Sequence, residues 1–162
     1  SKMTLAQIAW YQAQNLPSYR LDPPSLLNGS QTLDEVWDYV EKHTGEQQAV
    51  LVYSSDTPEM VRKYQELGTE RIAALLEQTS ADLAKRAVEH GYTRIISAGG
   101  ETSGAVTKGL HFSSYQIGES IAPGVPVMVP ATRPDIRLVL KSGNFGQEDF
   151  FGRALSMTRK KA

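Results

Sequence analysis

The residues of this chain best suited to chemistry lie in a glycine-rich stretch, Gly99–Gly104, which reads Gly-Gly-Glu-Thr-Ser-Gly. A short apolar run precedes this stretch and a helical pattern follows it, which predicts a turn between a strand and a helix N-terminus. Free backbone N–H groups and the helix dipole make such a turn a site for anions, most often phosphate. The side chains of Glu101, Thr102 and Ser103 add oxygens suited to a hydroxyl group, a phosphate-bound water or hydrated Mg²⁺.

This first turn matches neither of two common phosphate-binding patterns. Gly99 and Gly104 have the glycine spacing of G-x-x-x-x-G-K-[ST], but Ala105 and Val106 stand where Lys and Ser or Thr are needed. The order of its glycines also departs from G-x-G-x-x-G. Two interpretations remain open from this turn alone: a phosphate site, or a tight strand-to-helix connection in which a hydroxyl side chain only caps the helix.

A second strand, turn and helix follow near the C-terminal end, with the turn at Gly143–Gly146. In a parallel sheet both turns lie at the same carboxyl edge, where their N–H groups line one cleft. This arrangement favours a nucleotide or a similar phosphorylated ligand. Lys141 is either a point charge for phosphate or an ordinary surface lysine. Phe145 is either a packed hydrophobic plug or a wall against a flat base.

The turns need a framework of strands and helices, and the apolar pattern predicts one. Continuous apolar runs indicate strands covered on both faces at 49–53, 93–98 and 136–140, with shorter strands at 19–22 and 113–117. Helical spacing predicts helices at 3–15, after the capping box that starts at Thr32, and at 59–67, 71–90, 101–110 and 147–157. The predicted fold class is α/β, with three layers and a mostly parallel sheet that has helices on both faces.

Two local features of this framework carry further predictions. In the first helix the apolar spacing indicates an inner face made of Leu5, Ile8, Ala9 and Gln12. The segment 121–130 contains three prolines. It is therefore predicted to be a rigid loop with a Pro-Gly turn rather than a regular central strand.

Bulk composition limits the function classes. A length of 162 residues suits a single domain with a real core, and a formal net charge of -1 argues against a nucleic-acid partner. The chain has no cysteine, which excludes disulfides, a thiol nucleophile and a cysteine-based zinc site, and suits a cytoplasmic protein. No apolar run is long enough for a membrane span or a signal peptide, so no membrane partner is expected.

Three ordered motifs resemble one known family over essentially the whole chain. They are Gly99–Val106, Ile121–Pro126, and Leu140–Gly146 together with Asp149–Phe151. They look like the C-terminal nucleotide-binding domain of the four-carbon acid sugar kinases, and most like the 3-oxo-tetronate kinase branch. The resemblance implies a two-domain kinase in which an N-terminal domain holds the sugar acid and the C-terminal domain holds ATP.

The resemblance also implies which residues contact ATP: Gly100, Glu101, Thr102, Ser103 and Gly143. The family's C-terminal domain starts with a Gly-Ser-Cys-Ser-like strand end followed by a helix with Thr and Gln. Ser1, with Thr4 and Gln7, looks like the tail of that element, which makes Ser1 a further ATP contact. By the general logic of phosphoryl transfer, Mg²⁺ would bridge the phosphate oxygens.

We therefore expect residues 1–162 to form one nucleotide-binding domain, a C-terminal piece of a kinase that phosphorylates 3-oxo-tetronate or tetronate. No catalytic base is assigned, because Asp56, Asp135 and Asp149 are candidates by residue type only and the family places the base on the sugar-acid domain. The isolated chain is expected to bind nucleotide but to phosphorylate poorly or not at all. The alternative is a non-catalytic module that binds a nucleotide or a phosphometabolite, and association into a homo-oligomer stays open.

Overall fold

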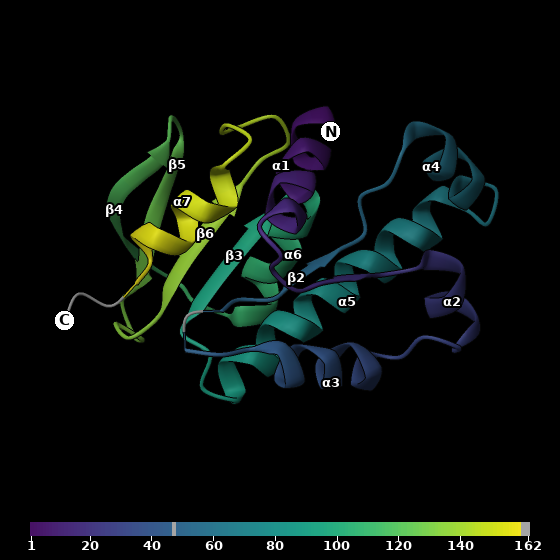
Figure 1. Cartoon of the computed structure of the whole chain (residues 1–162). Helices are drawn as coiled ribbons and strands as arrows, with labels where there is room; N and C mark the ends of the chain where they lie inside the picture. The colour runs from purple at the N-terminus through teal and green to yellow at the C-terminus, as the bar shows by residue number, and fades with distance from the viewer. Residues whose placement is uncertain (47, 160–162) are drawn as a thin grey trace.

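The computed structural model describes residues 1–46 and 48–159. Its helices are α1 (Lys2–Ala13), α2 (Pro23–Asn28), α3 (Leu33–His43), α4 (Pro58–Gln65), α5 (Thr69–Glu89), α6 (Gly100–Leu110) and α7 (Phe150–Met157). Its strands are β1 (Ser18–Arg20), β2 (Leu51–Tyr53), β3 (Arg94–Ala98), β4 (Tyr115–Ala122), β5 (Val125–Pro130) and β6 (Arg137–Lys141). Helices and strands alternate along much of the chain, which confirms the α/β fold class (Figure 1). Within the described ranges, none of these helices combines the length and the apolar character that crossing a membrane requires.

The described strands form two sheets. β1 and β2 make a parallel pair, with Tyr19 opposite Val52. The second sheet has the order β3-β6-β5-β4, in which β3 and β6 run parallel while β5 is antiparallel to both β6 and β4. Parallel pairing is thus found at the strands that lead into the glycine turns, and an antiparallel hairpin extends the sheet on the far side of β6.

Helices cover both faces of the strands, as expected for three layers. On one face α1 and α7 pack against β2 and β3 in a core that includes Ile8, Phe151, Leu51 and Ile96. On the opposite face α3 and α5 pack against the same two strands around Trp37. Figure 1 shows α1 and α7 above β3, with α3 and α5 below it. The two sheets therefore share the same pair of helical layers.

The segment 121–130 is not the loop that its prolines predicted, because most of it belongs to the hairpin of β4 and β5. Val127 and Met128 are the residues of β5 that pair with β6. Pro126 and Pro130 flank them, so neither proline has to donate an N–H group to that ladder. The prediction of a loop was wrong because proline is excluded from hydrogen-bonded positions, not from every position of a strand. The predicted Pro-Gly turn is confirmed, because Pro123 and Gly124 form the turn between β4 and β5.

Helix α1 buries a different face from the one predicted. The residues that it buries are Thr4, Gln7, Ile8 and Tyr11. Of the predicted inner face, only Ile8 is among them. Thr4 and Gln7 are buried because they bind carbonyl oxygens of the second glycine turn, so hydrogen bonding rather than apolar spacing sets the orientation of this helix.

Candidate functional site

The two glycine turns lie side by side at one edge of the sheet. Ala98, the last residue of β3, pairs with Lys141, the last residue of β6. The next N–H group, that of Gly99, donates to the carbonyl oxygen of Lys141 at 2.7 Å. Parallel pairing therefore brings together two turns that are more than forty positions apart in the chain, as the sequence predicts.

The first turn starts α6 without a side-chain cap. Gly99 has φ +105°, a conformation that favours glycine, and its carbonyl oxygen accepts from the N–H of Ser103 at 2.9 Å. Among the described residues, no hydrogen-bond partner is found for the N–H groups of Gly100, Glu101 and Thr102. The capping interpretation of this turn is therefore not supported, and three N–H groups at the positive end of a helix dipole remain open to a ligand.

The hydroxyl side chains of the first turn point in different directions. Thr102 lines the cavity described below, whereas Ser103 is buried and its hydroxyl donates to the hydroxyl oxygen of Ser97 at 3.3 Å. Gly100 and Glu101 are exposed. Of these residues, Ser103 is the one whose N–H and hydroxyl both have partners inside the fold.

The second turn is held through the carbonyl oxygen of Gly143. That oxygen accepts hydrogen bonds from Ser1 Oγ at 3.1 Å, Thr4 Oγ1 at 3.2 Å and Lys141 Nζ at 2.6 Å. Ser1 and Thr4 also bond each other through their hydroxyl groups at 2.8 Å. Helix α1 thus fixes the second turn and brings Ser1 to it, as the placement of Ser1 among the site residues requires.

Gln7 holds the remainder of the same turn. Its Nε2 donates to the carbonyl oxygens of Phe145 at 3.1 Å and Gln147 at 2.9 Å, and its side chain is fully buried. The ring of Phe145 is 48% exposed, so it is not the packed plug that one interpretation of the sequence predicted. Gly146 has φ +82° and lies against Phe150, where a Cβ atom would come within 2.7 Å of the ring.

Lys141 is the residue whose role sequence reasoning did not settle. Its side chain is 0% exposed, which rules out the ordinary surface lysine, and its Nζ also donates to Thr4 Oγ1 at 3.3 Å. Among the described residues it has no carboxylate partner. Burial lowers the pKa of Lys141, because a charged ammonium group is poorly solvated there. In the sequence, only two local features point to the contacts of Lys141 with Thr4 and Gly143. They are the hydroxyl residue at position 4 and the lysine at the end of an apolar strand.

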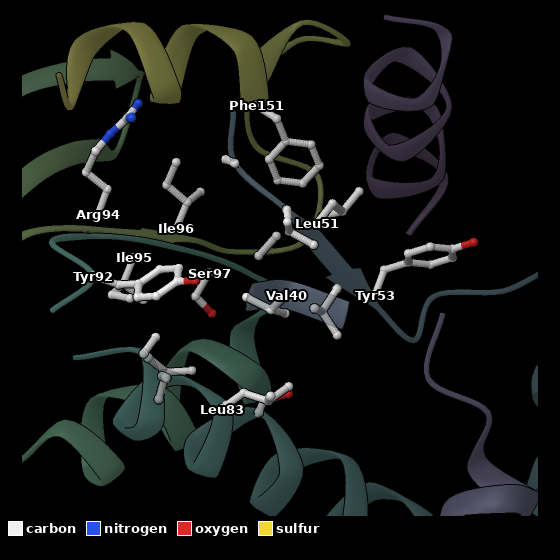
Figure 2. A pocket seen from close by; sticks show the side chains of 18 of the residues that line it. Val40, Leu51, Tyr53, Leu83, Tyr92, Arg94, Ile95, Ile96, Ser97 and Phe151 are labelled. Carbon is white, nitrogen blue, oxygen red and sulfur yellow. The ribbon is translucent and has the colours of Figure 1, made fainter. Parts of the chain in front are cut away.

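An open cavity of about 880 Å³ begins at the two turns. Of the predicted site residues, Ser1, Thr102 and Gly143 line it, and Gly100, Glu101 and Ser103 do not. Beyond this polar end the cavity runs between β2 and β3, where its lining is largely apolar. Figure 2 shows Leu51 and Tyr53 on one side and Ile95 and Ile96 on the other.

Asp56 is not available as a catalytic base in this structure. Its carboxylate accepts hydrogen bonds from Arg20, from Tyr64 Oη at 3.0 Å and from the N–H of Thr57 at 2.8 Å. Desolvation alone would raise the pKa of Asp56, but the bonds from Thr57, Tyr64 and Arg20 outweigh it and lower the pKa. Asp56 therefore anchors the loop after β2.

The other two candidate carboxylates also lie outside the cavity lining. Asp135 forms an ion pair with Arg133 at 2.9 Å. Asp149 is the N-cap residue of α7, without a side-chain cap hydrogen bond. Neither lines the cavity that starts at the two turns, and the same holds for Asp56.

Comparison with curated proteins identifies relatives over nearly the whole chain. The 3-oxo-tetronate kinase of Pseudomonas fluorescens is 41% identical over 157 residues, which are 96% of this chain and 36% of the relative. That of Brucella melitensis is 43% identical over 155 residues, which are 95% of this chain and 35% of the relative. The chain therefore spans little more than a third of the length of these relatives.

Solved structures share the same architecture. The Haemophilus influenzae protein HI1011 superposes with a TM-score of 0.91 at 35% identity, over 97% of this chain and 38% of that protein. A putative tRNA synthase from Salmonella typhimurium LT2 gives a TM-score of 0.87 at 33% identity, over 98% of this chain and 39% of that one. The family model described as "Nucleotide-binding C-terminal domain" matches residues 1–151. With its paired glycine turns and these relatives, the chain belongs to the family of nucleotide-binding C-terminal domains.

Proposed function

We propose that this chain is the ATP-binding domain of a sugar-acid kinase that phosphorylates a four-carbon acid, 3-oxo-tetronate or tetronate. The relatives named 3-oxo-tetronate kinase and the nucleotide-binding family support the reaction class. The single observation that carries the proposal is the pairing of an uncapped helix N-terminus with a second turn fixed by Lys141. In the proposed protein, an N-terminal domain of the same chain holds the sugar acid.

The residues of the two turns fit a polyphosphate group. A Cβ atom built on Gly100 or on Gly143 meets no atom within 4 Å, so both glycines face open space. The free N–H groups that follow Gly99 are donors for phosphate oxygens. Lys141 adds a positive charge that no carboxylate of the described chain neutralises. An anion with several oxygens would accept from these N–H groups and be attracted by the charge of Lys141.

Each predicted site residue has a part in this proposal. The N–H groups of Gly100, Glu101 and Thr102 would bind phosphate, and Ser1 and Gly143 would line the opposite wall of the cleft. Ser103 stays a prediction that the geometry does not favour, because both of its polar groups have partners inside the fold.

Mg²⁺ would be held mainly by phosphate oxygens and water. Within the described residues, no group of three or more acidic or histidine side chains is close enough to hold a metal ion. This arrangement is typical of phosphoryl-transfer sites, where Mg²⁺ takes few protein ligands and neutralises charge on the transferred group.

The chain's own residues would position the nucleotide and not activate the acceptor. The two turns hold phosphate groups by backbone N–H donors that are fixed before binding, which lowers the cost of reorganisation during transfer. A base for the acceptor hydroxyl would come from the N-terminal domain, because Asp56, Asp135 and Asp149 lie outside the cavity lining. Alone, the chain would bind ATP and transfer phosphate poorly or not at all.

Calorimetric titration with ATP and Mg²⁺ tests this proposal, on the full-length protein and on the chain that starts at Ser1. Gly100→Val adds a branched side chain beside the free N–H groups of α6, and Gly143→Val adds one at the cavity wall. Each is expected to weaken ATP binding at least about tenfold, or about 1.4 kcal/mol. Gly104→Val is the matched control. Gly104 lies in the same helix, its Cβ would also meet no atom within 4 Å, and it is one turn away from the free N–H groups.

The outcomes separate the proposed kinase from its alternative. Loss of binding in both turn variants, with phosphorylation of a tetronate by the full-length protein, supports the kinase. Binding that is lost in the same variants without any transfer by the full-length protein supports a non-catalytic nucleotide-binding module. Unchanged ATP binding in both turn variants would contradict a nucleotide site at these turns.

A further inference from the structure

Phe145 is an aromatic residue of the second turn to which the proposed phosphate contacts give no role. Of the four phenylalanines of the chain, Phe150 and Phe151 are buried, whereas Phe145 is 48% exposed. Within the described residues, its ring makes no stacked or edge contact with another aromatic ring. A single exposed apolar residue needs no functional reason by itself, so the surroundings of this ring decide its meaning.

The backbone that carries this ring is fixed on both sides. The N–H of Phe145 donates to the carbonyl oxygen of Ser142 at 3.1 Å, and its own carbonyl oxygen accepts from Gln7 Nε2 at 3.1 Å. Two residues earlier, the carbonyl oxygen of Gly143 accepts three further hydrogen bonds. The exposed ring therefore stands on an ordered backbone, so a ligand that binds to it does not have to order the turn first.

The tip of the β4–β5 hairpin holds the ring from the side. Gly124 lies in the turn of that hairpin with φ +79°, and a Cβ atom built on it would lie 3.2 Å from Cε1 and 3.7 Å from Cδ1 of Phe145. One edge of the ring thus packs against a backbone position that has no side chain. This contact fixes the ring and still leaves about half of the residue open to a flat group.

Phe145 also stands close to the cavity that begins at the two turns. Gly143 lines that cavity, and two residues of chain span at most about 7 Å. The N–H groups of Gly143 and Asn144 have no hydrogen-bond partner among the described residues. Free donors therefore continue from the start of α6 along the second turn as far as the ring. In a nucleotide the sugar separates the base from the phosphates, so the base belongs beyond these donors.

There is space at this place for a flat group. Figure 1 shows the second turn between the tip of the β4–β5 hairpin and the start of α1. A second cavity, of about 390 Å³, adjoins the contact of Phe145 with the hairpin, because Pro123 and Gly146 line it. Gln147 and Arg153 bring polar side chains to the same cavity. A group with a flat apolar face and polar edges suits these surroundings, and a nucleotide base has both.

We propose that Phe145 is the base-stacking residue of the nucleotide site, so that the base of ATP lies against its exposed ring while the phosphates occupy the two turns. This inference rests on the proposed function and adds the nucleoside end of the ligand to it. Every base has a flat π face. Stacking on Phe145 therefore favours a nucleotide over a polyphosphate without a base, and it does not select one base over another.

Calorimetric titration of the full-length protein with ATP and with inorganic tripolyphosphate, each with Mg²⁺, tests the stacking. Tripolyphosphate has the phosphate chain of ATP but neither its sugar nor its base. In Phe145→Ala the Kd for ATP is expected to rise at least about fivefold, the effect of losing one base–aromatic stack, while the Kd for tripolyphosphate stays within about twofold of wild type. Tripolyphosphate binding thus reports whether the turn itself is intact.

Two further variants serve as controls in the same titrations. Phe145→Tyr keeps a flat ring and should bind ATP as wild type does. Ile117→Ala removes another exposed apolar side chain, since Ile117 of β4 is 63% exposed, and should leave the binding of both ligands unchanged.

The outcomes separate the stacking from the nucleotide site itself. ATP binding that is unchanged in Phe145→Ala would overturn the proposal and would favour a base in the apolar cavity between β2 and β3. Equal weakening of ATP and tripolyphosphate would also overturn it, because Phe145 would then serve only the shape of the turn. A wild-type protein that binds neither ligand contradicts the nucleotide site and the stacking with it. A wild-type protein that binds both, without a selective loss of ATP binding in Phe145→Ala, contradicts the stacking alone.

Discussion

Lys141 donates a hydrogen bond of 2.6 Å from Nζ to the carbonyl oxygen of Gly143, two residues further along the chain. The ammonium group is buried with hydroxyl and carbonyl oxygens around it, and no carboxylate of the described residues pairs with it. A buried cation of this kind is expensive unless an anion compensates for it. Phosphate groups of a nucleotide bound at the two turns, as proposed, would supply that compensation.

Replacing Lys141 with methionine should therefore weaken ATP binding while leaving the fold intact. Methionine is unbranched and fills the space of the lysine stem, and the Gly143 carbonyl keeps its bonds from Ser1 and Thr4. We expect the Kd for ATP to rise at least about tenfold in Lys141→Met, measured by calorimetry on the full-length protein. Lys108→Met, at an exposed lysine of α6, is the control. Equal ATP affinity in the two variants would show that Lys141 serves only the fold.

The stability of the protein should also depend on the titration of Lys141. Burial lowers the pKa of Lys141 from its ordinary value of 10.5, whereas the unfolded chain keeps that value. Between the lowered pKa and 10.5 the unfolded state binds more protons, so the free energy of unfolding rises with pH in this interval. Urea unfolding at a series of alkaline pH values should show wild type gaining stability relative to Lys141→Met. A difference that stays constant with pH would contradict a lowered pKa.

Gln7→Ala should destabilise the protein by about 1–3 kcal/mol, because it leaves the carbonyl oxygens of Phe145 and Gln147 without their donor. The exposed Gln12 of the same helix provides the control. Gln12→Ala should change the free energy of unfolding by less than about 0.5 kcal/mol. Chemical denaturation of both variants measures the difference. If Gln7→Ala unfolds at the same denaturant concentration as wild type, α1 does not hold the second turn.

Alanine should lower the thermal stability at one glycine of the second turn and leave it almost unchanged at another. Gly146→Ala forces φ +82° on a residue with a Cβ atom and places that atom 2.7 Å from the ring of Phe150. We therefore expect the free energy of unfolding to fall by about 1–3 kcal/mol. Gly143→Ala meets no atom within 4 Å and should leave thermal stability almost unchanged. Thermal unfolding compares the two. Similar midpoints would mean that the turn is less tightly packed than its geometry indicates.

Much of the framework could be predicted from the sequence because its signals are local. The apolar runs that became β3 and β6 stand out against their surroundings, and the glycines after them mark the turns at the sheet edge. Parallel pairing then follows from the general behaviour of such units. The family of nucleotide-binding C-terminal domains was recognisable from the same motifs.

Other parts of the fold and the site depend on distant partners, which local patterns do not contain. The buried face of α1 is set by carbonyl groups that Thr4 and Gln7 reach across the fold, so apolar spacing pointed to the wrong residues. The burial of Lys141 depends on the same helix. The hairpin strand β5 tolerates its prolines only because β6 pairs between them. Ser1 was placed at the site by family resemblance alone, since a single serine carries no pattern.

The bonds between α1 and the second turn have a consequence for folding. Ser1 and Gly143 are 142 positions apart, so the cleft is complete only after α1 has met the turn that follows β6. Contacts this distant in sequence form slowly, because a large loop must close before they are gained. A nucleotide bound there would stabilise only molecules that have closed this loop, by about 2.7 kcal/mol at a hundredfold excess over its Kd. A higher nucleotide concentration would then lower the fraction of unfolded molecules and so slow the degradation of the domain.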